Sequence, residues 1–171
     1  HKYDPNGKYL FSFGESGTGE GQFNIVHNID TDRNGYLYVA DRENHRVQIF
    51  SPEGKYEMQW NNLSRVAAIY IDSRGGEETA YVGEYFCGIG SNDIGRDLGP
   101  RVTMMSLDGK VLGRAGRESY GDEAGRFYSP HGLAVDAHGD IYVAEVSWSD
   151  YGSQMEPPQE LRSMQKLVKV P

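Results

Sequence analysis

Two histidines occupy the same place in two copies of a repeated sequence. His27 lies in "VHNID" and His131 in "PHGLA", whereas the copy between them, "RVAAI", has Ala67 at that place. The nitrogen of a neutral imidazole binds Zn²⁺ at about 2.0–2.1 Å, and a catalytic zinc keeps one position open for water or substrate. His27 and His131 are therefore candidate ligands of a zinc ion, and the alternative is that each ring makes a structural hydrogen bond.

The repeat that carries these histidines has three copies in one register. Each copy has an aspartate at the end of a first strand, a glycine-containing turn, and a second strand that ends on an acid. Alternating β-branched or aromatic residues bounded by Gly, Asn and Asp are typical of strands in hairpins. The aspartates are Asp32, Asp72 and Asp136, and the acids are Asp41, Glu84 and Glu145.

Two more strands extend the repeat into a four-stranded unit. A third strand is expected at 46–50 and again at 101–105, and a short turn leads from each to a fourth strand. Four antiparallel strands recurring at about 40 residues or more are typical of a β-propeller blade. We therefore expect an all-β chain, and no stretch has a convincing helical period.

The chain divides into about three blades of a partial propeller, 1–171. We expect the last strand of a preceding blade in 1–14, a blade in 23–60, a second in 63–116 with an insertion at 85–100, and a last blade in 127–171 with an insertion at 146–163. Because propellers typically have four to eight blades, the remaining blades are expected elsewhere in a longer chain. The alternative is a pair of such halves, in which the lone first strand completes a partner's last blade.

The histidines and the longest loops are expected at one face of the propeller. Each histidine stands just before the innermost strand of its blade, at one mouth of the central channel. The loop 41–45 and the insertions 85–100 and 146–163 emerge at that face. Elaborated loops on a rigid scaffold are where binding and chemistry concentrate.

The stretch "HNIDTDRNGYLYVADRENHRVQIFSPEGK" resembles the NHL repeat, and the similarity covers nearly the whole chain. NHL propellers usually have six blades, so the resemblance implies the C-terminal half of a six-bladed propeller. Alternate blades of such a ring are related by a three-fold axis. A third histidine is then expected two blades before His27, and Ala67 keeps the alternation. A symmetric pair of halves would lack this spacing.

A closer resemblance links the two histidine-containing stretches to one enzyme family. "GQFNIVHNIDTDRNGYLYVADRENHRVQIF" and "FYSPHGLAVDAHGDIYVAE" are together similar to the catalytic domain of peptidyl-α-hydroxyglycine α-amidating lyases. The resemblance implies carbon–nitrogen bond cleavage that yields a peptide amide and glyoxylate. It also implies a zinc held by three histidines, two of which match His27 and His131. Gly132 replaces an aspartate that helps the family bind Ca²⁺, which argues against calcium here.

The same resemblance implies a catalytic role for Arg42, which matches the arginine of the family's "ADREN" segment. A fixed guanidinium can hold a carboxylate or stabilise an oxyanion. The alternative for Arg42 is an ion pair with Asp41 or Glu43 on a solvated loop. For the histidines, the alternative is a structural hydrogen bond to the backbone of a neighbouring blade. Tyr85 and Glu84 are further candidates for the channel mouth, unless the insertion that follows buries them.

Composition and charge exclude several classes of protein. The chain has 17 basic and 25 acidic residues, a net charge of −8, and no basic patch that would neutralise a run of phosphates, so no nucleic-acid partner is expected. No apolar run is long enough for a membrane span. The single cysteine, Cys87, excludes an intrachain disulfide framework and leaves the compartment open, an extracytoplasmic or secreted location included.

Three functions are compatible with these observations. The first is a zinc-dependent lyase that acts on a peptide or small-molecule substrate at the channel mouth. The second is a non-catalytic NHL module that binds a protein or a polysaccharide through the elaborated face. The third is a lactonase-type propeller hydrolase, whose metal is usually held by carboxylate and amide side chains and not by two histidines.

Overall fold

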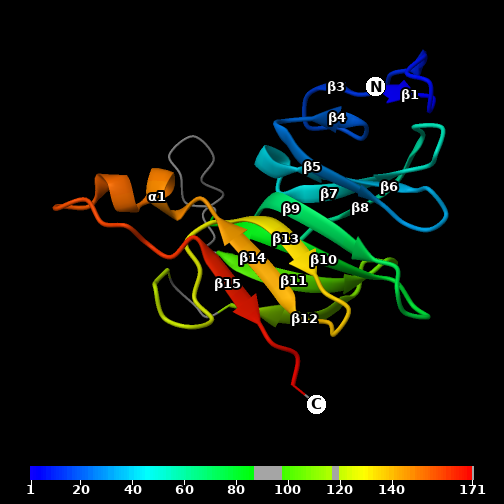
Figure 1. The fold of residues 1–171 in the computed structure, drawn as a ribbon. Helices are drawn as coiled ribbons and strands as arrows, with labels where there is room; N and C mark the ends of the chain where they lie inside the picture. The colour runs from blue at the N-terminus through cyan, green and yellow to red at the C-terminus, as the bar shows by residue number, and fades with distance from the viewer. Residues whose placement is uncertain (87–97, 117–119, 171) are drawn as a thin grey trace.

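The computed structural model describes residues 1–86, 98–116 and 120–170, and within them the expected all-β propeller architecture is confirmed (Figure 1). Three antiparallel sheets fan out from a shared centre, each with its first strand innermost, and the described sheets do not close into a ring. No helix among these residues is long and apolar enough to cross a membrane.

The sheets follow the repeat. The first contains β5 (Val26–Thr31), β6 (Leu37–Asp41), β7 (Arg46–Phe50) and β8 (Tyr56–Trp60). The second contains β9 (Arg65–Asp72), β10 (Thr79–Tyr85), β11 (Arg101–Ser106) and β12 (Val111–Ala115). The third contains β13 (Pro130–Val135), β14 (Ile141–Glu145) and β15 (Met164–Leu167).

The N-terminal segment differs from the single strand expected there. It forms a hairpin of β1 (Lys2–Tyr3) and β2 (Tyr9–Phe11), followed by a short parallel pair of β3 (Glu15–Ser16) and β4 (Gln22–Phe23). The hairpin closes on the turn at Asp4 to Gly7, where the Asp4 carboxylate accepts from the Lys8 amide at 2.8 Å. The hydrogen bonds of this turn therefore stabilise a hairpin with one more strand than the alternation of residue types indicated.

The long insertion of the last sheet contains two helical turns. They are α1 (Ser147–Asp150) and the 3₁₀ turn η2 (Gly152–Gln154), and a further 3₁₀ turn, η1 (Arg42–Asn44), joins β6 to β7. Each is too short to give a periodic pattern in the sequence. Most of the other insertion, together with Cys87, lies outside the described residues.

The hydrophobic core fills the two spaces between neighbouring sheets. One cluster, with Val47, Trp60, Val66 and Val82, joins the first sheet to the second. The other, with Phe127 at its centre, joins the second to the third. Fully burying one such side chain stabilises the fold by roughly 1.5–3 kcal/mol, so packing between blades holds the sheets together.

The repeated aspartates form the turns between first and second strands. Asp32 Oδ1 accepts from the amides of Asn34 and Tyr36, each at 2.9 Å. Asp136 Oδ1 accepts in the same way from the amides two and four residues later. Gly35 adopts a φ of +82° in this turn, a conformation that side chains other than glycine's disfavour. The Asp–x–x–Gly spacing is thus a requirement of the turn.

The repeated acids at the ends of the second strands are buried and tie each sheet to its entry segment. Each accepts a backbone N–H from the residue that leads into its own first strand. The pairs are Asn24 N to Asp41 Oδ1 at 2.7 Å, Ser64 N to Glu84 Oε2 at 2.6 Å, and Tyr128 N to Glu145 Oε2 at 2.6 Å. These acids are structural, and the carboxylate of the fully buried Glu84 also accepts from Arg101 and Thr103.

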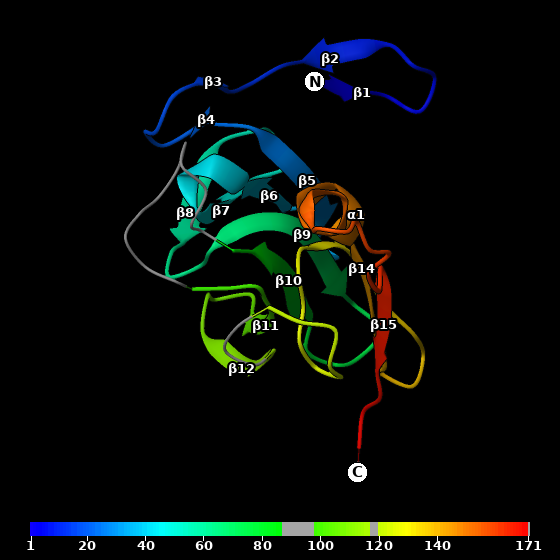
Figure 2. The same cartoon turned by 90° about the vertical axis from the view of Figure 1, so that its left-hand side faces the viewer.

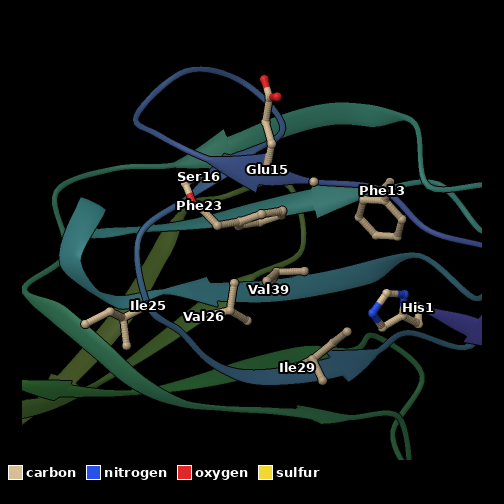
Figure 3. Close-up of a pocket in the computed structure, with 10 residues that line it drawn as sticks. His1, Phe13, Glu15, Ser16, Phe23, Ile25, Val26, Ile29 and Val39 are labelled. Carbon is tan, nitrogen blue, oxygen red and sulfur yellow. The ribbon is translucent and has the colours of Figure 1, made fainter.

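The first sheet has an open apolar side. Ile25, just before β5, and Val26 and Ile29 of β5 are about half exposed, and with Phe13 and Phe23 they line a pocket of about 440 Å³ (Figure 3). On its other side, β5 packs on β9, where Asp30 Oδ2 accepts from the Ile71 amide at 2.7 Å. Only one side of this sheet is therefore covered by a neighbouring sheet within the described residues.

Candidate functional site

His27 and His131 lie side by side at the centre of the fan. His27 is on β5 and His131 on β13, the first strands of the two outer sheets, and their ring centroids are 4.4 Å apart at an interplanar angle of 79°. The strand between them, β9, carries the fully buried Ala67 at the equivalent place. The structure thus brings together the two histidines that the repeat places in alternate sheets.

A β-bulge positions both imidazoles. In β5 the pairing with β6 skips His27, since Val26 faces Asp41 and Asn28 faces the adjacent Ala40. The pairing of β13 with β14 skips His131 in the same way. A bulge leaves its extra residue unpaired and redirects its side chain, and bulges are frequent next to active sites.

The same bulge is present in the middle sheet, although no histidine is there. Val66 of β9 faces Glu84 and Ala68 faces Gly83, so the pairing skips Ala67. The bulge therefore belongs to the repeat and does not depend on the residue that occupies it.

A backbone carbonyl fixes the orientation of His27. Its Nδ1 lies 2.9 Å from the carbonyl oxygen of Ala67. A carbonyl oxygen only accepts hydrogen bonds, so Nδ1 carries the proton and the neutral ring has its lone pair on Nε2. Histidine ligands of metals are commonly held by such a bond from the other ring nitrogen. The structural hydrogen bond and a ligand role are thus compatible in one residue.

Both imidazoles are neutral at pH 7. Burial lowers the pKa of His27, and the positive charges of Arg42 and Arg65 lower it further. Burial likewise lowers the pKa of His131, with Arg42 acting in the same direction. Neutral imidazole is the form that binds metal ions.

The histidine pair has the spacing of two ligands of one metal ion. Two imidazoles on one tetrahedral zinc, with Zn–N of about 2.0–2.1 Å, have ring centroids roughly 5 Å apart. The 4.4 Å separation needs only a small adjustment. No set of three His, Cys, Asp or Glu side chains among the described residues could hold a metal ion, so those residues alone do not form a metal site.

Tyr85, at the end of β10, lies against the histidine pair. Its ring centroid is 5.7 Å from that of His131 and 6.5 Å from that of His27. The guanidinium carbons of Arg42 and Arg65 lie 5.9 and 5.5 Å from the centroid. Burial raises the pKa of Tyr85, which keeps the phenol protonated at neutral pH. Tyr85 is thus both buried and next to the candidate site.

Arg42 lies at this site and is held by its neighbour. Its Nε donates to Glu43 Oε1 at 2.7 Å, and Arg65 Nη2 donates to the same oxygen at 2.6 Å. The ion pair with Glu43 that the alternative interpretation expected is thus present, and the Arg42 side chain is 18% exposed. Arg65, which begins β9, was not expected here, because nothing in the repeat distinguishes its position.

Comparison with known proteins places the repeat in a family. The model of the NHL repeat matches residues 23–50 and 127–149, which include His27, Arg42 and His131. NHL repeat-containing protein 3 of Homo sapiens is 44% identical over 54 residues, covering 31% of this chain and 16% of its own. B-box type zinc finger protein ncl-1 of Caenorhabditis elegans is 37% identical over 137 residues, covering 80% of this chain and 15% of its own.

Two solved structures agree in fold. A protein of unknown function from Bacteroides caccae superimposes with a TM-score of 0.58 at 12% identity, over 82% of this chain and 44% of that one. Virginiamycin B lyase from Staphylococcus aureus gives 0.50 at 10% identity, over 84% and 41%. The chain spans less than a fifth of the curated relatives described above. The repeats, the relatives and the fold together establish that this chain is an NHL-repeat protein.

Proposed function

We propose that this NHL-repeat protein is a zinc-dependent carbon–nitrogen lyase of the amidating-lyase type, with His27 and His131 as metal ligands and Arg42 as a catalytic residue. The observation that carries the proposal is the 4.4 Å approach of two imidazoles from alternate sheets, each at a β-bulge. A third ligand is proposed to come from a histidine outside this sequence.

Each side chain of this site has a separate role in the proposed reaction. The Ala67 carbonyl holds His27 with Nε2 available as a ligand atom. Glu43 fixes the plane of Arg42, whose guanidinium binds the carboxylate of an α-hydroxy amide substrate or the oxyanion that develops on it. The protonated Tyr85 phenol and its aromatic ring line the site beside the histidines. Zinc, when bound, would lower the pKa of the substrate hydroxyl.

Metal analysis of the purified intact protein tests this proposal. We expect zinc that is lost in His27→Ala and in His131→Ala. The matched control is His138→Ala, since His138 is exposed on the turn between β13 and β14. An intact propeller that binds no zinc, or one that keeps its zinc in both variants, would overturn the proposal.

A second candidate is a non-catalytic NHL module that binds a protein. Its support is the set of relatives, which includes the E3 ubiquitin-protein ligase TRIM71 of Rattus norvegicus, 43% identical over 47 residues. In that case the bond from His27 to Ala67 serves only to join two sheets. Zinc content and release of glyoxylate from an α-hydroxyglycine peptide separate the two candidates.

A further inference from the structure

A pocket next to the histidine site combines aromatic walls with one buried carboxylate. Its volume is about 500 Å³, and it is lined by Phe86, Asp150, Tyr151, Gln154 and Met155. Asp150 is the last residue of α1, in the insertion between β14 and β15. Figure 2 views the molecule from this side and shows α1, in orange, nearest the viewer and in front of the sheets.

Asp150 carries an oxygen that is buried and unsatisfied. Its Oδ2 is inaccessible to solvent and has no hydrogen-bond partner in the described part of the chain. No ion pair of Asp150 is found among those residues, and the nearby Arg42 and Arg65 are both paired with Glu43. A buried carboxylate oxygen without a donor is costly, so a donor supplied by a ligand would remove a penalty that the fold otherwise bears.

Two aromatic rings, those of Phe86 and Tyr151, form part of the pocket wall, and Tyr120 packs against both. The centroids of Phe86 and Tyr151 are 5.4 Å apart, and Tyr120 lies 5.5 Å from Phe86 and 5.3 Å from Tyr151. The faces of such rings are electronegative and attract cations within about 6 Å of the ring centroid. Phe86 also stacks on Tyr85 at 6.3 Å and 13°, so the pocket shares a wall with the histidine site.

The residues that line this pocket favour an organic cation over a metal ion. A metal ion requires several oxygen or nitrogen ligands, and the described residues contain no group of three acidic, histidine or cysteine side chains suited to one. An organic cation needs one anionic partner and apolar or aromatic surroundings. The net charge of −8 adds a long-range attraction for it.

We propose that the pocket formed by Phe86, Asp150 and Tyr151 binds a substituted ammonium group, which donates to the Asp150 carboxylate and packs against the two rings. The ammonium belongs to a free amine or to a lysine side chain of a peptide. This inference is independent of zinc, since Asp150 belongs to no metal-binding group among the described residues.

Calorimetric titration of the intact protein tests the proposal with three probes. These are methylammonium, the blocked peptide acetyl-Gly-Lys-Gly-amide, and the same peptide with norleucine in place of lysine. We expect saturable binding of the lysine peptide and none of the norleucine peptide. Binding of methylammonium as well indicates that a free cation suffices, and its absence assigns the site to a peptide side chain. Failure of both cations to bind, or equal binding of the norleucine peptide, overturns the proposal.

Variants locate the binding and separate it from a structural role. Asp150→Asn should weaken binding of the lysine peptide about tenfold to hundredfold, the effect of losing one charged hydrogen bond. Glu160→Gln removes an exposed acid from the same insertion and should leave binding unchanged. Asp150→Asn should also raise the midpoint of thermal unfolding, because it removes an unsatisfied buried charge. A lowered midpoint with unchanged affinity would mean that Asp150 is only structural. Zinc content should be the same in both variants, so this proposal and the zinc proposal can fail separately.

Discussion

The Nδ1 of His27 donates to the backbone carbonyl of Ala67, 2.9 Å away on the first strand of the next sheet. This bond joins two blades at the point where their sheets meet, and it also determines which ring nitrogen is left for a ligand. His27 therefore has a structural role through Nδ1 and a proposed ligand role through Nε2, and different substitutions can remove one role or both.

The first prediction uses that separation. His27→Ala loses the bond between blades and should lower the free energy of unfolding by about 0.5–1.5 kcal/mol. His27→Asn places an amide donor near the position of Nδ1 but has no imidazole Nε2, so it should keep most of that stability and still lose zinc. Urea denaturation with metal analysis checks both. Equal destabilisation by the two substitutions would argue against the hydrogen bond.

A second prediction concerns pH. Burial lowers the folded-state pKa of His27 and of His131 below 6.5, so the unfolded chain binds protons more readily than the folded chain. The contribution of these two groups to stability is complete above pH 6.5 and is lost as the pH falls through their folded pKa values. Urea denaturation of metal-free protein between pH 7.5 and pH 5 measures this loss. The double variant His27→Asn, His131→Asn should have a flatter profile, and an unchanged slope would contradict the assignment.

The third prediction concerns a repeated acid. Asp41 is fully buried, accepts from the Asn24 amide and pairs with Arg46 Nε at 2.8 Å. Asp41→Ala leaves the Arg46 charge and that amide without their partner and should cost about 3–5 kcal/mol. The control is Asp108→Ala, since Asp108 is exposed and bonded only within its own turn. Thermal unfolding should detect a large loss for Asp41 and almost none for Asp108.

The fourth prediction tests the catalytic role of Arg42. Lysine at this position keeps a positive charge near Glu43 but loses the planar fork that holds a carboxylate. Arg42→Lys should lower kcat/KM for an α-hydroxyglycine peptide by about 10²-fold, the effect of removing one oriented donor, with zinc content unchanged. Full activity in this variant would mean that Arg42 has no catalytic role and serves only in its ion pair with Glu43.

The fold could be predicted from the sequence because its landmarks are requirements of the backbone. Asp32 and Asp136 satisfy turn amides, and Asp41, Glu84 and Glu145 satisfy the amides of entry segments, so these residues recur at fixed places. The proximity of His27 and His131 followed from the same register once a propeller was expected.

Other parts of the site depend on packing that no local pattern encodes. Tyr85 and Arg65 meet only because two sheets pack together, and an isolated arginine at the start of a strand looks like any exposed charge. Asp150 is on a four-residue helix in an insertion, where one turn gives no periodicity. The bulges were missed because a skipped residue changes the pairing but not the alternation of residue types on either side.

The bulge shared by β5, β9 and β13 has a consequence for how such proteins change over time. Each blade provides the same backbone feature at the same depth, and residues 27, 67 and 131 differ only in the side chain that occupies it. One substitution at such a position adds or removes a group at the centre while strand pairing stays intact. A chain with this scaffold can therefore gain or lose an imidazole at the centre through a single mutation, without any change of fold.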